Sequence, residues 1–319
     1  MRGQESLIDS DIHSNYNNYM KIFSGSANRP LAENVAHSLG LELSPIELHT
    51  FPDGEQRVML EEKVVGEDVV IIQSTGIPTD KNYMELFFII DAARRNGAKS
   101  ITVVIPYIGY QRQDHVFRAG EARSLEVLIR FMEQVGGTRF IAVDTHSVKI
   151  PELFIKPFVH LSALPLFAKK IKEDNLADKD TFLVSPDMGG IRRIKQLSRM
   201  LSDMPYAAIE KNRDLRSGRV AADTIHGEIH KRAIIVDDMI SSGGTIKTAC
   251  ELLKKKGVGE IYVFATHPVF SENAPELLEG SPAKKVYVTD TIFVSKFSQF
   301  PKLEILSVAN IIAEQLKYE

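Results

Sequence analysis

The sequence has few of the features that mark secreted, membrane or nucleic-acid-binding proteins. One cysteine among 319 residues, Cys250, excludes an intramolecular disulfide framework and a paired-thiolate metal site. No apolar run approaches the length needed to cross a bilayer, and the polar opening lacks the hydrophobic core of a secretion signal. A net charge of −3 gives no electrostatic footprint for nucleic acid or an anionic membrane. We therefore expect a cytoplasmic protein with neither nucleic acid nor a membrane as its partner.

Short β-branched apolar runs alternate along the chain with amphipathic stretches of helical periodicity. The expected strands are residues 20–25, 68–75, 100–107, 139–146, 181–187, 232–239, 260–267 and 285–291. The expected helices between them include residues 82–97, 124–137, 189–201 and 244–257. Continuous apolar runs suit strands buried on both faces of a parallel sheet. The order of strands and helices therefore predicts an α/β fold with right-handed crossovers.

This pattern runs twice, which predicts two domains for a chain of this length. The first set of elements ends near Asp144–His146, and the second begins near residues 161–164. We expect a flexible arm over residues 1–19, an N-terminal domain over 20–162 and a C-terminal domain over 163–319. Packing of the last helix against the N-terminal domain is one arrangement open to the C-terminus.

Polar residues follow four of the expected strands. These strand exits are residues 106–114, 144–146, 185–190 and 237–245. In open α/β sheets, ligands gather beyond the carboxyl ends of the strands. One such exit also fits ordinary helix capping, but four together indicate a ligand site.

The last of these exits has the composition of a phosphate-binding turn. Gly243 and Gly244 let the main chain approach a ligand closely, while Ser241, Ser242 and Thr245 supply hydroxyls at the start of a helix. Backbone amides and the positive end of the helix dipole favour an anion at such a position. The turn therefore predicts a cradle for a phosphate monoester.

Two adjacent acids, Asp237 and Asp238, precede this turn. They would repel a phosphate if they faced it, so they must face another group. Carboxylates accept hydrogen bonds from vicinal hydroxyls or bind a divalent cation. The acids and the turn together predict a ribose 5-phosphate pocket, although the same residues also fit a strand-to-helix turn with an aspartate cap.

The stretch from Asp237 to Thr245 resembles the 5-phosphoribosyl 1-diphosphate loop of type I phosphoribosyltransferases and of ribose-phosphate diphosphokinases. Six further motifs occur in the order found in the diphosphokinases, and they separate the two groups: "FPDGE" at 51–55, "NYMELFFIIDAARRNGAKSITVVIPYIGYQRQD" at 82–114, "DTHS" at 144–147, "SPDMGG" at 185–190, "EKNR" at 210–213 and "HPVFSENA" at 267–274. The resemblance covers nearly everything from Met20 onward. It implies two similar type I phosphoribosyltransferase-like domains, each with a central, mainly parallel sheet flanked by helices.

The resemblance also implies an activity and its cofactor. Enzymes of this family move the β,γ-diphosphoryl group of ATP onto the anomeric hydroxyl of ribose 5-phosphate, giving AMP and 5-phospho-α-D-ribose 1-diphosphate. The reaction depends on Mg²⁺. By resemblance, the N-terminal domain takes ATP and the C-terminal domain takes ribose 5-phosphate.

Five residues match the ATP side of the family. Phe51, Asp53 and Glu55 correspond to residues that reach the adenine from a neighbouring subunit, which implies a homo-oligomer with a shared ATP site. Arg112 and Gln113 match residues at the nucleotide, where a guanidinium can hold phosphate oxygens bidentately.

Two further pairs match the centre of the reaction. His146 and Asp187 correspond to the family's magnesium-associated positions, although a histidine nitrogen is a poor ligand for so hard an ion. A lone histidine at a strand end also fits a structural role. Lys211 and Arg213 align with the basic pair of the mobile catalytic loop, where cations neutralise the phosphoryl oxygens. We expect this loop, which continues through residues 216–218, to close over the reactants and to be disordered without them.

Four residues depart from the common bacterial and mammalian pattern. Ser241 and Ser242 stand where that pattern has Asp-Thr, Thr145 stands where it has leucine, and Asn212 stands where it has a second arginine. Together with a short C-terminus, these departures predict a member of the archaeal-type, short-tailed branch.

Two other functions remain open from the sequence. A phosphoribosyltransferase would use the same sugar-phosphate loop but would not need the ATP-side motifs. A non-catalytic homologue that binds nucleotides and regulates a partner enzyme would be expected to lose the loop lysine, the histidine or the acid pair.

Overall fold

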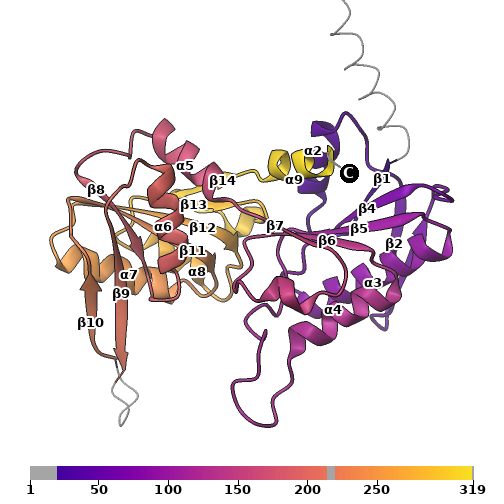
Figure 1. Cartoon of the computed structure of the whole chain (residues 1–319), viewed down its shortest axis with the longest axis horizontal. Coiled ribbons are helices and arrows are strands. Elements are labelled where there is room, and N and C mark those ends of the chain that lie inside the picture. The colour runs from indigo at the N-terminus through magenta and orange to yellow at the C-terminus, as the bar shows by residue number, and fades with distance from the viewer. Residues whose placement is uncertain (1–19, 214–219, 318–319) are drawn as a thin grey trace, which may run out of the picture. The chain divides into compact units, whose positions relative to one another are not determined.

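The computed structural model of the chain describes residues 20–213 and 220–317, so the predicted arm over residues 1–19 lies outside it. Two compact units make up the fold. Unit 1 holds the chain through Leu161, the short segment Thr291–Phe293 and the stretch from Ala309 onward; unit 2 holds Ser162–Asp290 and Val294–Val308. Each unit has a mainly parallel sheet flanked by helices (Figure 1), which confirms the predicted α/β class.

Unit 1 is built on a five-stranded parallel sheet with the order β1-β4-β5-β6-β7. Helices α2 and α9 lie against each other on one side of this sheet, and α3 and α4 lie on the other (Figure 1). The elements are β1 (Met20–Ser24), α2 (Arg29–Ser38), β2 (Ile46–Thr50), β3 (Gln56–Leu60), β4 (Asp68–Ile72), α3 (Thr79–Arg95), β5 (Ser100–Ile105), α4 (Ser124–Val135), β6 (Arg139–Val143), the 3₁₀ turn η1 (Ile150–Leu153), β7 (Phe158–Leu161) and α9 (Ala309–Lys317).

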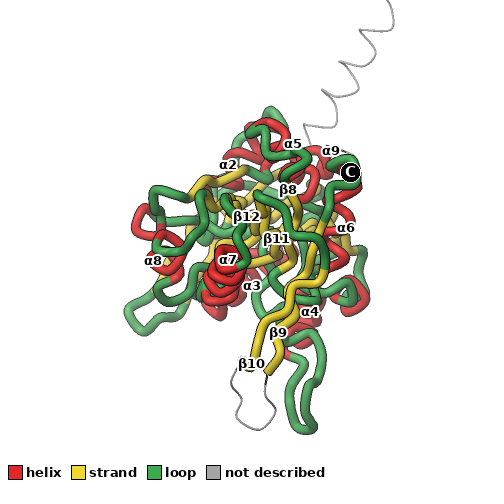
Figure 2. Tube along the Cα trace, turned by 90° about the vertical axis from the view of Figure 1, so that its left-hand side faces the viewer, coloured by secondary structure: helices red, strands yellow, loops and turns green. Residues whose placement is uncertain are grey.

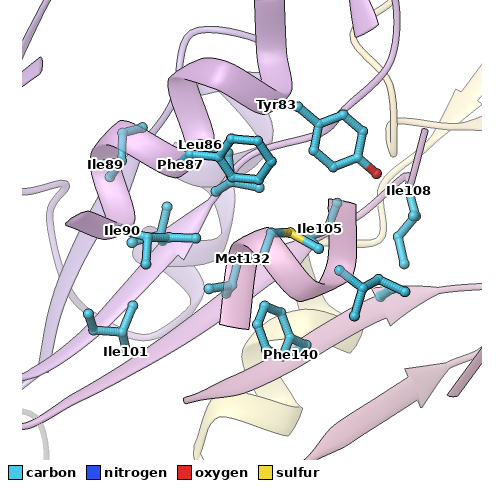
Figure 3. Packing of buried hydrophobic residues seen from close by; sticks show 14 of the residues in the cluster. Tyr83, Leu86, Phe87, Ile89, Ile90, Ile101, Ile105, Ile108, Met132 and Phe140 are labelled. Atoms are coloured by element: carbon cyan, nitrogen blue, oxygen red, sulfur yellow. The ribbon is translucent and has the colours of Figure 1, made fainter. Parts of the chain in front are cut away.

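The core of unit 1 follows from the helical spacing of apolar residues on α3. Tyr83, Leu86, Phe87 and Ile90 recur at intervals of three and four, so they form one face of the helix. Figure 3 shows this face packed over the sheet, with Met132 of α4 in the same cluster. The apolar face of α3 therefore fixes that helix against strands whose polar exits lie beyond their carboxyl ends.

Unit 2 is built on a seven-stranded sheet with the order β10-β9-β8-β11-β12-β13-β14, in which only β10 runs antiparallel to its neighbour. The elements are α5 (Leu164–Glu173), β8 (Thr181–Ser185), α6 (Ile191–Met200), β9 (Tyr206–Arg213), β10 (Val220–His226), β11 (Arg232–Ile240), α7 (Gly244–Lys255), β12 (Glu260–Pro268), α8 (Ala274–Glu279), β13 (Lys285–Thr289), the 3₁₀ turn η2 (Lys296–Ser298) and β14 (Leu303–Leu306). Figure 2 shows β9 and β10 running side by side.

Successive residues of the central strands of unit 2 alternate between its two apolar layers. Val263 and Ala265 of β12 join the cluster under α7, whereas Phe264 meets Phe167 of α5 on the other face, with 5.4 Å between ring centroids. Cys250 is buried in the α7 layer, and burial raises the pKa of its thiol to about 12. The single cysteine is therefore a packing residue.

The apolar runs predicted the strands well, and they failed where strands are short or partly exposed. All eight expected strands are present and begin at the predicted residues, and the four expected helices are α3, α4, α6 and α7. The strands β2, β3, β7 and β14 were not predicted, because they are only partly buried and carry no continuous apolar run. The strands β9 and β10 were not predicted either, although β9 begins with a short run in which Ala207, Ala208 and Ile209 are buried. Within the described ranges, no helix is long and apolar enough to span a bilayer.

Replacing a core residue of α3 tests this packing. Leu86 is fully buried, so Leu86→Ala should lower the free energy of unfolding by about 2–5 kcal/mol, through lost burial and a residual cavity. Met84→Ala on the same helix, at a side chain that is 45% exposed, should change it by only about 0.5 kcal/mol. Urea denaturation followed by circular dichroism measures both, and equal shifts would contradict the assigned helix face.

Candidate active site

The acid pair lies within the central strand of unit 2. Asp237 and Asp238 belong to β11, where their exposed fractions are 9% and 5%. From β8 the chain moves outward to β9 and β10, then returns to place β11 on the opposite side of β8. Such a reversal of strand order opens a crevice at the carboxyl edge, the usual ligand position in open α/β sheets. The acids therefore lie at the switch point of this sheet.

The turn after β11 has the backbone of an anion site. Gly243 has φ +79°, a left-handed conformation that side chains disfavour, and α7 begins at the next residue. Its N-cap residue, Gly243, has no side chain that could cap the helix. A side chain added at Gly244 would meet nothing closer than the Ser242 hydroxyl, at 3.9 Å, so the space above the turn is open. The start of α7 can thus accept an anion through its amides.

The exit of β12 fixes one side of this turn. The Phe270 amide donates to the Ile240 carbonyl at 3.0 Å, and the Ser271 amide donates to the Ser241 carbonyl at 3.1 Å. The hydroxyls of Ser241 and Ser271 also lie 3.1 Å apart. Phe270 and Glu272 have φ values of +43° and +56°, strained conformations of the kind found at functional loops. The turn is therefore rigidly shaped before any ligand arrives.

Arg193, which was not predicted from the sequence, faces the acid pair from the first turn of α6. Its Nη1 lies 3.4 Å from Asp237 Oδ1, and its Nη2 lies 3.4 Å from Asp238 Oδ1. Burial, followed by the charge of Asp238, raises the pKa of Asp237 well above its usual value, and Arg193 opposes this rise. The only sequence signal was a basic residue in the helix after the β8 exit, which becomes informative once β8 and β11 are known to be neighbours.

Asp187 lies in the β8 exit of the same unit. Its Oδ1 accepts a hydrogen bond from the Gly190 amide at 3.1 Å, and its carbonyl accepts one from the Ser185 hydroxyl at 2.7 Å. Its negative charge also contributes to the raised pKa of Asp237. Across residues 20–213 and 220–317, no group of three or more His, Cys, Asp or Glu side chains could by itself hold a metal ion.

His146, Arg112 and Gln113 belong to unit 1, at the exits of the neighbouring strands β5 and β6. Arg112 and Gln113 are exposed. The His146 amide donates to the side chain of Gln111 at 2.9 Å, which ties the two exits together. Unit 1 therefore gathers three of the predicted residues at one edge of its own sheet.

Phe51, Asp53 and Glu55 lie together in the turn between β2 and β3. The Phe51 amide donates to the Glu55 carbonyl at 2.8 Å, and the Glu55 amide donates to Asp53 Oδ1 at 3.1 Å. The Phe51 ring is 38% exposed and has the His49 ring at its edge, with 4.7 Å between centroids. The ring is thus partly exposed at the tip of a hairpin, with the Arg57 guanidinium over it at 5.9 Å from the centroid.

Lys211 and Arg213 lie on the last part of β9. Lys211 pairs with Asp223 of β10 across the antiparallel ladder, and Arg213 pairs with Val220. The described part of this loop is therefore a two-stranded ribbon at the edge of the sheet, beside β8 (Figure 2). Residues 216–218, on which loop closure and disorder were predicted, lie outside the described residues.

Comparisons with known proteins agree with this geometry. The model of the N-terminal domain of ribose phosphate pyrophosphokinase matches residues 20–136, and the phosphoribosyl synthetase-associated domain matches residues 208–318. Ribose-phosphate pyrophosphokinase 2, chloroplastic, from Oryza sativa subsp. japonica is 41% identical over 300 residues, which cover 93% of this chain and 74% of that relative. The chain belongs to the ribose-phosphate pyrophosphokinase family.

A bacterial relative and a solved structure place the chain in the same family. Ribose-phosphate pyrophosphokinase from Thermotoga maritima is 39% identical over 304 residues, which cover 94% of this chain and 95% of that relative. The crystal structure of phosphoribosylpyrophosphate synthetase from Mycobacterium smegmatis is 33% identical with a TM-score of 0.88, covering 93% of this chain and 97% of that chain. The predicted family and its two-domain α/β architecture are confirmed.

The buried acid pair makes a prediction about stability and pH. Because the pKa of Asp237 is higher in the folded chain, the folded state loses stability as the pH rises from the ordinary carboxyl pKa through the raised one. Asp237→Asn removes this ionisation and keeps Oδ1 as an acceptor for the Asp238 amide. The variant should be more stable than the parent at about pH 8, by about 1 kcal/mol or more. This advantage should shrink toward about pH 3, below the ordinary carboxyl pKa, where both states hold the proton.

Thermal and urea unfolding at several pH values measure the effect. Asp203→Asn, on an exposed turn of the same unit, makes the same change of charge and serves as the control. An advantage of Asp237→Asn that does not vary with pH would contradict the electrostatic origin.

Proposed function

We propose that this chain transfers the β,γ-diphosphoryl group of ATP to the anomeric hydroxyl of ribose 5-phosphate, giving AMP and 5-phospho-α-D-ribose 1-diphosphate. The observation that carries the proposal is the juxtaposition, at the switch point of unit 2, of the acid pair and an open helix-start turn. An anion and a diol need opposite charges around them, and this site offers both within nine residues, from Asp237 to Thr245. A pentose 5-phosphate fits that division.

The sugar phosphate binds with its two ends in different surroundings. Its phosphate lies against the amides that begin α7 and the hydroxyls of Ser241, Ser242 and Thr245. Its vicinal hydroxyls donate to Asp237 and Asp238, which lie too deep in β11 to be solvated well. The buried carboxylates therefore exchange weak solvation for strong hydrogen bonds when the sugar enters.

Diphosphoryl transfer then requires an in-line approach and neutralised oxygens. The anomeric oxygen attacks the β-phosphorus, the bond from that phosphorus to the oxygen shared with the α-phosphate breaks, and AMP leaves with that oxygen. The protein's part is to hold the reactants and to neutralise charge. We assign neutralisation to Lys211 and Arg213, whose positions on the edge ribbon support an approach from one side of the site.

The cofactor is proposed to be Mg²⁺, with Asp187 as its main protein ligand. Carboxylate oxygen suits this hard cation, and the lack of a three-residue ligand cluster among the described residues fits an ion held mostly by phosphates and water. When bound, the ion neutralises the phosphate oxygens of ATP. His146 is proposed to act beside it, through hydrogen bonds to water or phosphate.

ATP is proposed to bind unit 1, with Arg112 and Gln113 at its phosphates. Phe51, Asp53 and Glu55 of a neighbouring subunit would contact the adenine, so the active form is a homo-oligomer. The partly exposed ring of Phe51 at a hairpin tip supports a contact with a ligand of another subunit. Residues 20–162 then form the ATP domain and residues 163–319 the ribose 5-phosphate domain.

The cellular compartment and the branch of the family are also proposed. The protein is proposed to work in the cytoplasm, which its single, buried cysteine suits. Its place on an archaeal-type, short-tailed branch is proposed from the departures at Ser241, Ser242, Thr145 and Asn212. The plant and bacterial relatives given above lend this branch no support.

An AMP assay tests the activity. With Mg²⁺ and ATP, AMP should form only when ribose 5-phosphate is present, and Lys211→Ala should lower kcat by about 100-fold or more, because a cation facing the transferred group is lost. Lys255→Ala, exposed on the last turn of α7, is the matched control. Nucleotide binding without AMP would favour a regulatory homologue, and a nucleoside monophosphate made from a free base would favour a phosphoribosyltransferase.

Arg193 gives a second kinetic prediction. Arg193→Met leaves two buried carboxylates facing each other, so one of them keeps a proton and accepts the sugar hydroxyls poorly. The KM for ribose 5-phosphate should rise about tenfold, equivalent to about 1.4 kcal/mol, while the KM for ATP stays within about twofold.

The conservative variant and a neighbouring arginine sharpen this test. Arg193→Lys should recover only part of the loss, because one ammonium cannot face two carboxylates as a planar guanidinium does. Arg192→Met, at the exposed neighbouring position, should match the parent. Equal increases in both KM values for Arg193→Met would argue against a role at the sugar.

A further inference from the structure

Gln111 is a buried polar residue to which neither the sequence motifs nor the proposed mechanism assigns a role. It follows Tyr110 at the exit of β5, and its exposed fraction is 1%. Its Nε2 atom is fully buried and has no hydrogen-bond partner. Buried amide donors without partners are rare in folded proteins, so each calls for an explanation.

The orientation of this carboxamide is fixed by its other end. The His146 backbone amide donates to Gln111 Oε1 at 2.9 Å. Because an amide nitrogen cannot accept that hydrogen bond, the oxygen must face His146 and the NH₂ group must point elsewhere. The donor left over is therefore Nε2, at the junction of the β5 and β6 exits.

The backbone before Gln111 is held in one conformation by hydrogen bonds to Gly109. The Gly109 amide donates to Thr75 Oγ1 at 2.7 Å, and the Tyr83 hydroxyl donates to the Gly109 carbonyl at 2.9 Å. A side chain at Gly109 would come within 2.5 Å of the Thr75 carbonyl oxygen. Tyr110 itself is held at φ +60°. The backbone that carries the unpaired donor is thus fixed, and only the side-chain torsions of Gln111 are left to bring Nε2 to a ligand.

The position of Gln111, beyond the carboxyl end of β5, indicates which kind of group its Nε2 donor binds. Glu67 Oε2 and His230 Nε2 are also buried and make no hydrogen bond, although His230 Nε2 lies 3.7 Å from Glu228 Oε2; they precede β4 and β11, so they lie near the amino ends of their strands. Gln111 lies at the carboxyl end, where ligands bind in this class of fold. The missing partner must be an acceptor, and a neutral N–H donor binds an anionic oxygen most strongly. Arg112, which comes next, favours an anion in the same place.

We propose that the Gln111 carboxamide donates a hydrogen bond to a phosphate oxygen of the nucleotide bound to unit 1. Gln111 is then a ligand-binding residue at one end of its side chain, and a positioning residue for the His146 backbone at the other. Nucleotide binding completes the hydrogen bonding of a side chain that is incomplete in the free protein. The inference rests on the proposed function only in taking ATP as the nucleotide of unit 1.

Gln111→Glu isolates the donor. Glutamate has the same shape and keeps an oxygen for the His146 amide, but it replaces the NH₂ donor with an acceptor that repels phosphate. In isothermal titration of the full-length protein with Mg²⁺ and a non-hydrolysable ATP analogue, the Kd should rise tenfold or more. The Kd for adenosine, which has no phosphate, should stay within twofold of the parent value. A merely structural role would weaken both ligands alike, and that result would overturn the proposal.

Two further variants keep the test decisive. Gln134→Glu adds the same charge at an exposed position of α4 and should leave both affinities unchanged. If Gln111→Glu fails to fold, Gln111→Met removes the donor without adding charge, and it should weaken the analogue at least threefold while sparing adenosine. An analogue affinity equal to that of the parent in the folded variant, or a parent that does not bind the analogue, overturns the proposal.

The result is separable from the proposed function. A parent chain that binds the analogue but forms no AMP from ATP and ribose 5-phosphate would contradict the proposed reaction. The selective loss of analogue binding in Gln111→Glu would still support Gln111 as a phosphate-binding residue in that case.

Discussion

Two adjacent carboxylates buried in a central strand are the constraint around which unit 2 is arranged. Asp237 and Asp238 face a large desolvation cost, and a strand that continued as an apolar run would avoid it. The fold tolerates them because Arg193 faces both and because β11 runs past the last residue that it pairs with on β8, while it stays paired with β12. The two buried acids therefore lower the stability of the fold, as is expected of residues whose role is to bind a ligand.

The two units use different devices to make a site from one architecture. In unit 2 the strand order reverses between β8 and β11, and the reversal leaves space for a ligand at the turn after β11. In unit 1 the order β1-β4-β5-β6-β7 advances in one direction, without such a reversal among its described strands. Its polar exits are shaped instead by strained backbone at Tyr110 and Asp144 and by the Gln111 bridge. One site follows from topology, and the other from local conformation.

These differences explain which parts of the fold and of the two sites could be predicted from the sequence. Buried parallel strands are continuous apolar runs, so their first residues could be predicted, and their exits carried the motif residues. Arg193 could not be found this way, because its meaning depends on the pairing of β8 with β11, which are separated in sequence by α6 and the β9–β10 ribbon. The role of Gln111 could not be predicted either, because it rests on the missing hydrogen-bond partner of Nε2, which only the structure shows. Sequence patterns indicate which residues are buried, whereas the roles of Arg193 and Gln111 depend on which residues lie next to them in the folded chain.

Rigidity of the turn after β11 also bears on the two serines that depart from the common family pattern. Ser241 lies within 3.1 Å of the Ser271 hydroxyl, and its carbonyl accepts the Ser271 amide, so a neutral side chain at this position helps hold the turn against the β12 exit. An aspartate there would add a further carboxylate to a site in which the charges of Asp238 and Asp187 already raise the pKa of Asp237. The serine therefore preserves the shape of the cradle without adding charge. Positioning and fixed dipoles, which a small hydroxyl supplies, are what phosphate binding at a helix start requires.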